Sequence, residues 1–219
     1  MGGYTHGHFW RVRVRPTILP LLHITAWETL AACVNILIAA RLAGPTTVLA
    51  MQVDALLTPY VISNQRSRST DVQHILYGLL NSAHYRQNIA GRLVCRHLSG
   101  DGNVPADYAS RGLWEELARL CEQLNVKPIL VQLSESERTL VVSTIRDAAS
   151  RKQVSLDEEA MGDLFVDTMP TALSGGLDLE PMGAAGSDDT PLAEDAEDKP
   201  AQGTRRPRRQ YEDAPPNDP

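Results

Sequence analysis

The sequence HLSGDGNVPADYASR, residues 97–111, decides how the fold of this chain is interpreted. The apolar run Leu93–Cys95 just before it is typical of a β-strand, which ends at His97. Two glycines then predict a turn, and Asn103 is a residue type that commonly begins a helix. Asp107 falls in the first or second turn of that helix, beside the turn that carries His97. The stretch therefore predicts a strand–loop–helix junction that holds a carboxylate.

Strands and helices alternate along the rest of the first half of the chain. Periodicity predicts strands over residues 4–14, 46–53 and 92–97, and helices over residues 24–42, 69–88 and 106–124. The alternation RVRVR at residues 11–15 predicts a charged, solvated face on the first strand. The last helix is expected to turn four leucines inward: Leu113, Leu117, Leu120 and Leu124. The order of elements is typical of an α/β layer architecture.

Three acidic residues occupy related places in this order. Glu28 lies early in the first helix, Asp54 at the carboxyl end of a strand, and Asp107 early in the last helix. Because ligand sites in α/β sheets gather beyond the carboxyl ends of the strands, we expect the three carboxylates to converge. Clustered carboxylates suit Mg²⁺, and a pair of such ions supports phosphodiester hydrolysis.

Each candidate residue also has a purely structural interpretation. Glu28 could favour the helix dipole, Asp54 could cap the next helix, and Asp107 could support the turn below it. His97 could hydrogen-bond a loop instead of contacting substrate phosphate. Arg111 could close a salt bridge instead of contacting a nucleic-acid backbone. The residues alone leave these alternatives open.

Residues 97–111 also carry a longer motif, His-x-x-Gly-x-x-Asn-x-x-Ala-Asp-x-x-Ser-Arg, with every position filled. This motif resembles the end of the RNase H domain in retrotransposon reverse transcriptases, in particular those of the Gypsy and DIRS-like groups. The resemblance covers roughly residues 1–125 and is most specific at residues 97–111. It implies an RNase H-like three-layer fold with a mixed sheet.

The resemblance also implies roles for individual residues. Glu28 in ITAWETL, Asp54 in VDA and Asp107 match the family's second, third and fourth metal-binding acids, so they would be the catalytic residues and the ligands of Mg²⁺ or Mn²⁺. The partner would be an RNA–DNA hybrid, together with the polymerase part of a larger polyprotein. The implied substrate-binding residues are His97, Asn103 and Arg111.

The chain departs from the family pattern at its beginning. The family's first acid lies on a strand that would precede Gly2, and this sequence holds no acidic residue before Glu28. Without that strand, which is missing here, we expect the metal to be held weakly and hydrolysis of the hybrid to be impaired. The alternative is a catalytically dead nucleic-acid-binding or structural module of the same fold. A third interpretation, a fold shared with an integrase or Holliday-junction nuclease, does not account for the Asn-x-x-Ala-Asp-x-x-Ser-Arg ending.

Charge and cysteine content narrow the class of protein. Residues 1–134 hold 12 Lys and Arg against 8 Asp and Glu, whereas residues 135–219 hold 9 against 19. A mildly basic first part suits a phosphate-backbone partner. Three well-separated cysteines, Cys33, Cys95 and Cys121, lie in apolar runs, which indicates buried thiols in a reducing, intracellular compartment, either cytoplasm or nucleus.

The apolar stretch at residues 24–42 raises the question of a membrane span. Its uncharged part between Glu28 and Arg41 has only 12 residues. A span needs about 20 apolar residues. We therefore expect a buried core helix and no membrane association.

Composition divides the chain into three parts. Residues 1–125 are expected to form the truncated RNase H-like domain, and residues 126–173 an extended piece near 128–133 with peripheral helices, one over 135–152. In residues 174–219, Gly, Ala, Asp, Glu and Pro dominate, which predicts a disordered acidic tail. The block RRPRR at residues 205–209 is either a nuclear-localisation or nucleic-acid patch, or a solvated patch that offsets its acidic neighbours.

Overall fold

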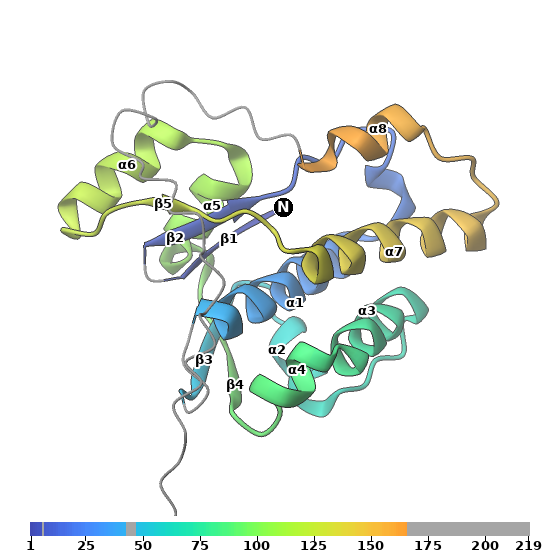
Figure 1. The fold of residues 1–219 in the computed structure, drawn as a ribbon, viewed down its shortest axis with the longest axis horizontal. Helices are drawn as coiled ribbons and strands as arrows, with labels where there is room; N and C mark the ends of the chain where they lie inside the picture. Colours follow the sequence, from blue (N-terminus) through green and yellow to red (C-terminus); the bar gives the residue numbers. More distant parts are fainter. Residues whose placement is uncertain (6, 43–46, 166–219) are drawn as a thin grey trace, which may run out of the picture. The chain divides into compact units, whose positions relative to one another are not determined.

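Helices and two small sheets alternate along the part of the chain that the computed structural model describes, residues 1–5, 7–42 and 47–165 (Figure 1). The strands are β1 (Gly2–Thr5), β2 (His8–Arg11), β3 (Leu49–Val53), β4 (Leu93–His97) and β5 (Ile129–Leu130). The α-helices are α1 (Ile24–Leu42), α2 (Thr58–Asn64), α3 (Thr70–Asn81), α4 (Ala83–Asn88), α5 (Val104–Arg111), α6 (Trp114–Gln123), α7 (Glu135–Lys152) and α8 (Glu158–Gly162). Short 3-10 helices are η1 (Leu19–Leu21), η2 (Gly100–Gly102) and η3 (Asp163–Phe165). The predicted α/β class is confirmed.

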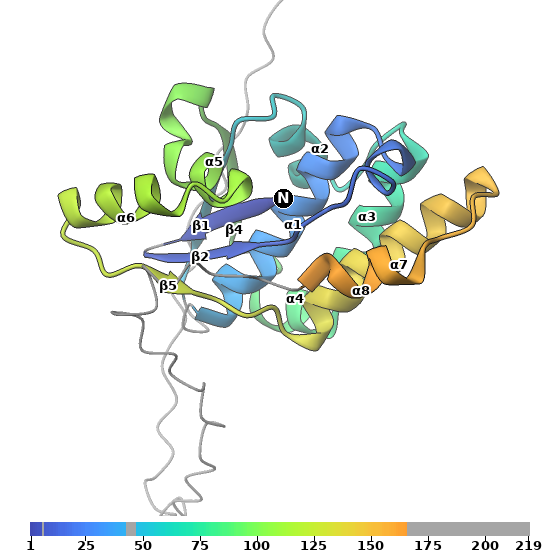
Figure 2. The same ribbon diagram turned by 90° about the horizontal axis from the view of Figure 1, so that it is seen from above.

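The strands form two separate sheets within the described ranges. In the first sheet β1 pairs antiparallel with β2, and β2 pairs parallel with β5, so the pairing is mixed (Figure 2). In the second sheet β3 and β4 are parallel, with Leu49 opposite Leu93 and Val53 opposite His97. The carboxyl ends of β3 and β4 therefore meet at one edge.

The strand predicted over residues 4–14 is wrong in its extent. The chain instead forms the β1–β2 hairpin, which turns at Gly7, where φ is +83°. Glycine adopts this left-handed conformation at little cost, so the hairpin closes where one long strand was predicted. After β2, the N–H of Arg13 donates to Leu164 O at 3.1 Å. The pairing of the hairpin thus ends at Val12, and Arg13 bonds to the last described residues.

The helix predicted over residues 106–124 is divided into α5 and α6. The break lies at Gly112, where φ is +73° and the N–H donates back to α5. Of the four leucines predicted to face inward, Leu117 is buried, but Leu113 and Leu124 are exposed because they lie at the two ends of α6. A glycine in the left-handed region ends a helix, and this explains the error.

The helix predicted over residues 69–88 is also divided. It begins as predicted, with the Ser69 side chain accepting a hydrogen bond from the N–H of Val72. At Ser82 the backbone is extended, and the Ser82 hydroxyl caps α4 by accepting from Tyr85 N–H. Serine favours such cap positions. The apolar residues on either side of Ser82 therefore belong to two helices and not to one. The helices predicted over 24–42 and 135–152 match α1 and α7.

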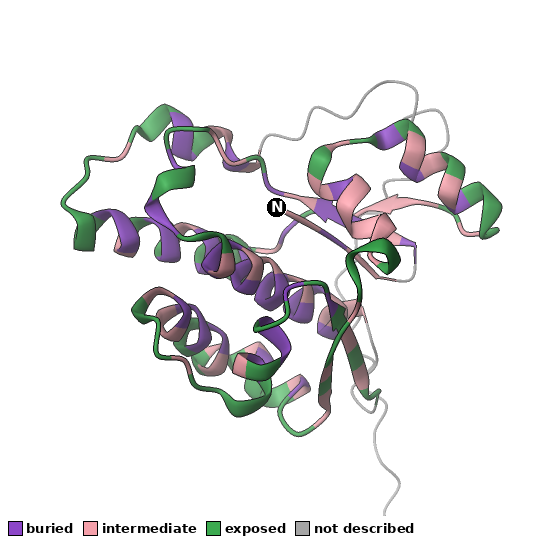
Figure 3. Ribbon diagram, turned by 180° about the vertical axis from the view of Figure 1, so that it is seen from behind, coloured by how far each residue is buried: buried purple, intermediate pink, exposed green. Residues whose placement is uncertain are grey.

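Helix α1 is largely buried. It contacts β1 and β3 as well as α2, α3, α4 and α7, and most of its ribbon is purple in Figure 3. By length and composition, α1 is the one helix in the described ranges that could cross a membrane, and 61% of the tested window is buried inside the protein. The predicted core helix is confirmed. Its buried residues are Ala26, Trp27, Thr29, Leu30, Ala32, Cys33, Val34, Ile36, Leu37, Ile38 and Ala40.

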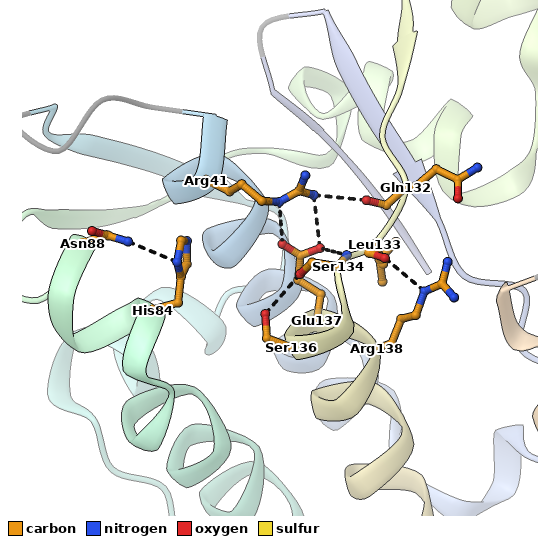
Figure 4. A network of polar contacts seen from close by, with 9 residues as sticks. All are labelled: Arg41, His84, Asn88, Gln132, Leu133, Ser134, Ser136, Glu137 and Arg138. Atoms are coloured by element: carbon orange, nitrogen blue, oxygen red, sulfur yellow. Dashed lines mark hydrogen bonds and ion pairs between the residues drawn. The ribbon is translucent and has the colours of Figure 1, made fainter. Parts of the chain in front are cut away.

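A buried ion pair joins the end of α1 to the start of α7 (Figure 4). Glu137 is only 1% exposed, and its two carboxylate oxygens accept from Arg41 Nε and Nη2, each at 3.2 Å. The N–H of Ser134 also donates to Glu137, at 2.7 Å, and completes a capping box. The buried charge is therefore both paired and hydrogen-bonded, as a buried carboxylate requires.

Two glycines of β1 show that helices cover both faces of the first sheet. A Cβ on Gly2 would lie 2.7 Å from the backbone of Ser110 in α5, and a Cβ on Gly3 would lie 2.5 Å from Asn35 Oδ1 in α1. Successive strand residues point to opposite faces, so α5 and α1 lie on opposite sides of β1. The arrangement around β1 has three layers.

The three cysteines are free, and each is at least partly buried. Cys33 and Cys121 are buried, Cys95 is half-buried, and none forms a disulfide. Burial raises the pKa of all three thiols, that of Cys95 to about 11. At neutral pH the three thiols are protonated and poorly reactive, as expected for buried structural cysteines.

Several predictions lie outside the described residues. They are the acidic tail at 174–219, the basic block at 205–209 and the last part of the piece at 126–173. Contacts divide the chain into a unit Met1–Glu180 and a unit Pro181–Pro219, and every described residue belongs to the first unit.

Candidate functional site

A cavity of about 520 Å³ lies between β1 and β3, and α1 and α5 also line it. Four of the six predicted site residues are among its lining residues: Glu28, Asp54, Asn103 and Asp107. A second cavity of about 720 Å³ is lined by the same two strands, and Asn103 lines both. Residues that are far apart in the sequence therefore line the same cavity.

Each acid is placed by the element that carries it. Glu28 lies in the second turn of α1 and is half-buried. Asp54 directly follows β3, and Asp107 lies in the first turn of α5. At that position the helix dipole favours a negative charge. The three acids reach the cavity from a helix, a strand end and a second helix.

The charge of Asp54 acts on Glu28. The pKa of Glu28 is raised, first because burial disfavours its charged form and second because Asp54 carries a like charge, while His23 opposes both effects. No described basic side chain forms a salt bridge with Glu28 or Asp54. These two residues give the cavity a negatively charged end, which is a common setting for cation binding.

Asp107 is paired within its own helix. Its Oδ1 accepts a hydrogen bond from Arg111 Nε at 2.8 Å, and this ion pair joins residues one helical turn apart. Arg111 is mostly exposed and does not line the cavity. Over the described ranges, no three His, Cys, Asp or Glu side chains form a group that could hold a metal ion. The three acids thus share a cavity without forming a preassembled three-ligand site.

His97 and Asn103 flank the acids. His97 Nε2 lies 3.1 Å from the backbone oxygen of Asp54, which is the loop contact that the sequence left open. Through this contact His97 holds the turn that positions Asp54. Asn103 is the residue before α5, but its side chain makes no capping hydrogen bond. The helix therefore leaves the Asn103 amide available to the cavity that it lines.

Three basic groups belong to residues that line the same cavity, and the sequence interpretation missed them. They are the Met1 amino group, Arg11 and Arg13. Burial and the nearby Arg11 lower the pKa of the Met1 amino group to about 6. Arg11 Cζ lies 5.6 Å from the Trp114 ring centre, and Arg11 Nε is buried without a hydrogen-bond partner. The alternation at residues 11–15 was the available signal, but a solvated strand face was the prediction drawn from it.

Comparison with known proteins adds no assignment. No protein-family model, no curated protein and no solved structure matches this chain.

Proposed function

We propose that residues 1–125 form an RNase H-like domain of a retroelement, which acts on RNA–DNA hybrids with the help of a divalent cation. The observation that supports this most strongly is that Glu28, Asp54 and Asp107, from three distant elements, line one cavity of about 520 Å³. The order of hairpin, helix, strand, helices, strand and helix around this cavity agrees with the proposal. The motif at residues 97–111 supplies four of the lining residues, Asn103, Ala106, Asp107 and Ser110.

The donor set at the cavity fits a hard divalent cation. Carboxylate oxygens are the ligands that Mg²⁺ and Mn²⁺ accept in proteins, and the mutual repulsion of Glu28 and Asp54 would be relieved by a cation between them. Asp107 would be the third ligand once its contact with Arg111 is released. A bound cation would polarise a phosphodiester and activate water for hydrolysis.

The remaining site residues suit contacts with nucleic acid. Arg11 and Arg13 are among the residues that line the cavity, and their positive charge suits contacts with phosphate oxygens. Asn103 offers an amide at the start of α5, and Arg111 is a further candidate for a phosphate contact. His97 holds the backbone of Asp54 and so keeps one carboxylate in place.

A second candidate function is binding of nucleic acid without hydrolysis. One observation favours it: Asp107, one of three candidate ligands, is already paired with Arg111 at 2.8 Å. In either case we propose weak metal binding, an intracellular setting that keeps the free thiols reduced, and the polymerase part of a polyprotein as a further partner.

The test is cleavage of an RNA–DNA hybrid with labelled RNA, compared with a DNA duplex of the same sequence. We expect binding that weakens with salt and slow, Mg²⁺-dependent cleavage of the hybrid only. Glu28→Gln, Asp54→Asn and Asp107→Asn should each abolish cleavage. Glu122→Gln, on the exposed end of α6, is the matched control and should leave it unchanged.

The two candidates separate in this assay. Hybrid binding without any cleavage in Mg²⁺ or Mn²⁺ would select the binding module. Cleavage that survives Asp54→Asn and Asp107→Asn together would contradict the proposed site. Absence of hybrid binding at low salt would remove both candidates.

A further inference from the structure

Helix α2 turns large apolar side chains outward at its beginning. Leu56 and Leu57 directly precede the helix and are 72% and 58% exposed, and Tyr60 in its first turn is 66% exposed. Leu57 already has helical dihedral angles and Tyr60 follows three residues later, so both side chains lie on one face of the helix. Asn64, four residues after Tyr60, continues this face and is exposed. We call these four residues the α2 face.

Packing inside the protein explains only the opposite face of α2. Its buried residues are Thr58, Pro59 and Ile62. This inner face lies on α1 and β4, and the Thr58 hydroxyl is 3.4 Å from the Thr29 hydroxyl of α1. Single exposed apolar side chains are common on soluble proteins, but a contiguous group of large ones marks an interaction surface. The α2 face is therefore a candidate for contact with another macromolecule.

Charges of opposite sign flank the α2 face. Asp54 lies before it and Arg66 after it, and both are exposed. The N–H of Arg66 donates back to Val61 O at 3.2 Å, so Arg66 stays at the end of the helix. Neither Asp54 nor Arg66 forms a salt bridge in the described part of the chain. In the sequence both are six residues from Tyr60, one on each side.

We infer that the α2 face joins two copies of this chain, packed antiparallel about a two-fold axis near Tyr60. In a two-fold interface both copies use the same patch, so the patch must complement itself. The α2 face meets this condition, because Asp54 of each copy would face Arg66 of the partner subunit. Tyr60 would pack on the partner subunit's Tyr60 and Leu57. The inference is independent of the proposed nuclease activity.

The pattern of charge distinguishes this occupant from other partners. A face flanked by charges of one sign would repel a second copy and would suit an oppositely charged partner. Here the two ends differ in sign, so an antiparallel copy is attracted at both ends. The apolar centre is small, and interfaces at the small end of the size range are weak. We therefore expect a dimer that forms only at high protein concentration.

The first test is sedimentation equilibrium of the full chain between micromolar and millimolar concentration. EDTA is present, because a divalent cation at Glu28 and Asp54 would compete with Arg66 of the partner subunit. We expect an average mass that rises from one chain towards two. Tyr60→Ser should weaken the association by about tenfold or more, since aromatic residues at the centre of an interface supply much of its binding energy. Tyr77→Ser is the matched control, because Tyr77 on α3 is 58% exposed and lies outside the α2 face.

The second test reverses the flanking charges one at a time. Asp54→Arg gives a copy with two positive ends, and Arg66→Asp gives a copy with two negative ends. Each variant alone should remain monomeric, because like charges then meet at both ends of the interface. An equimolar mixture of the two should form a heterodimer, since opposite charges meet again at both ends. Adding Tyr60→Ser to both variants should abolish this association, which separates the interface from unspecific attraction.

The mixture also guards against misfolded variants, because recovery of the dimer requires that both folded. Three outcomes would overturn the inference. The first is a single monomer mass at every concentration, which would leave the α2 face to a different partner. The second is dimerisation that survives Tyr60→Ser, which would place the interface elsewhere. The third is a mixture of the charge variants that stays monomeric. None of these outcomes depends on hydrolysis, so failure here is distinct from failure of the proposed function.

Discussion

The two sides of α1 differ in how completely they are packed. On one side α3 and α7 cover the helix, and the Arg41–Glu137 pair closes its end. On the other side the two sheets leave cavities of about 520 and 720 Å³ between β1 and β3. Because burial of apolar surface drives folding, the helical side should supply most of the stability. The candidate site lies on the side that is packed least.

The largest effect is expected on the helical side. Glu137→Ala leaves Arg41 without its partner and removes the capping box of α7. Breaking a buried ion pair by removing one partner costs about 3–5 kcal/mol. Urea unfolding should show this loss, whereas Glu135→Ala, an exposed neighbour in the same turn, should cost far less. Equal effects of the two substitutions would contradict the assigned role of Glu137.

The next effect is a pH dependence of stability, which arises at the Met1 amino group beside β1. The Met1 amino group has a pKa of about 6 in the fold against 8.0 in the unfolded chain. The unfolded chain binds the proton more tightly, so stability falls as pH decreases from 8 through 6. The shift corresponds to roughly 2–3 kcal/mol. Urea unfolding between pH 5 and 9, with intact mass showing that Met1 is present, measures it.

An N-terminal extension is the control for this pH dependence. It replaces the ammonium by an amide that can still donate to Val12 O, so the dependence between pH 6 and 8 should disappear. A dependence that persists in the extended chain would assign it to another group.

A smaller loss of stability is expected where β1 meets α5. In Gly2→Ala, the new Cβ would lie 2.7 Å from Ser110 backbone atoms, which cannot rotate away. Overpacking of this kind costs about 1–3 kcal/mol. Gly100→Ala, whose Cβ would meet nothing within 4 Å, is the matched control. If both variants melt alike, α5 does not pack on β1 as described.

The smallest change in stability is expected at the site itself. Arg111→Ala removes an exposed ion pair with Asp107, which is worth about 0.3–0.5 kcal/mol. The same change frees Asp107, so Mg²⁺ affinity measured by calorimetry should increase. Arg119→Ala, which removes the exposed pair with Glu116, is the control and should leave Mg²⁺ affinity unchanged. Lower Mg²⁺ affinity in Arg111→Ala would contradict a role for Asp107 as a ligand.

The sequence predicted the elements better than their breaks and contacts. Apolar residues at helical spacing located α1, the polar stretch after residue 134 indicated α7, and the motif at 97–111 placed Asp107 at the start of a helix. Gly7 and Gly112 divided predicted elements because both adopt a positive φ. The sequence alone does not show which glycines adopt this conformation. The basic residues of the cavity, Arg11 and Arg13, were missed because the β1–β2 hairpin was predicted as one strand. The Asp107–Arg111 pair was one of two open alternatives.

The most direct test of the shared carboxylate site is Mn²⁺ titration of the isotope-labelled chain followed by NMR. Paramagnetic broadening falls steeply with distance, so it reports where the ion binds. We predict that amide signals around Glu28, Asp54 and Asp107 broaden first and together, and that Glu28→Gln with Asp54→Asn removes this effect. Broadening that begins elsewhere and leaves these three regions sharp would contradict the account.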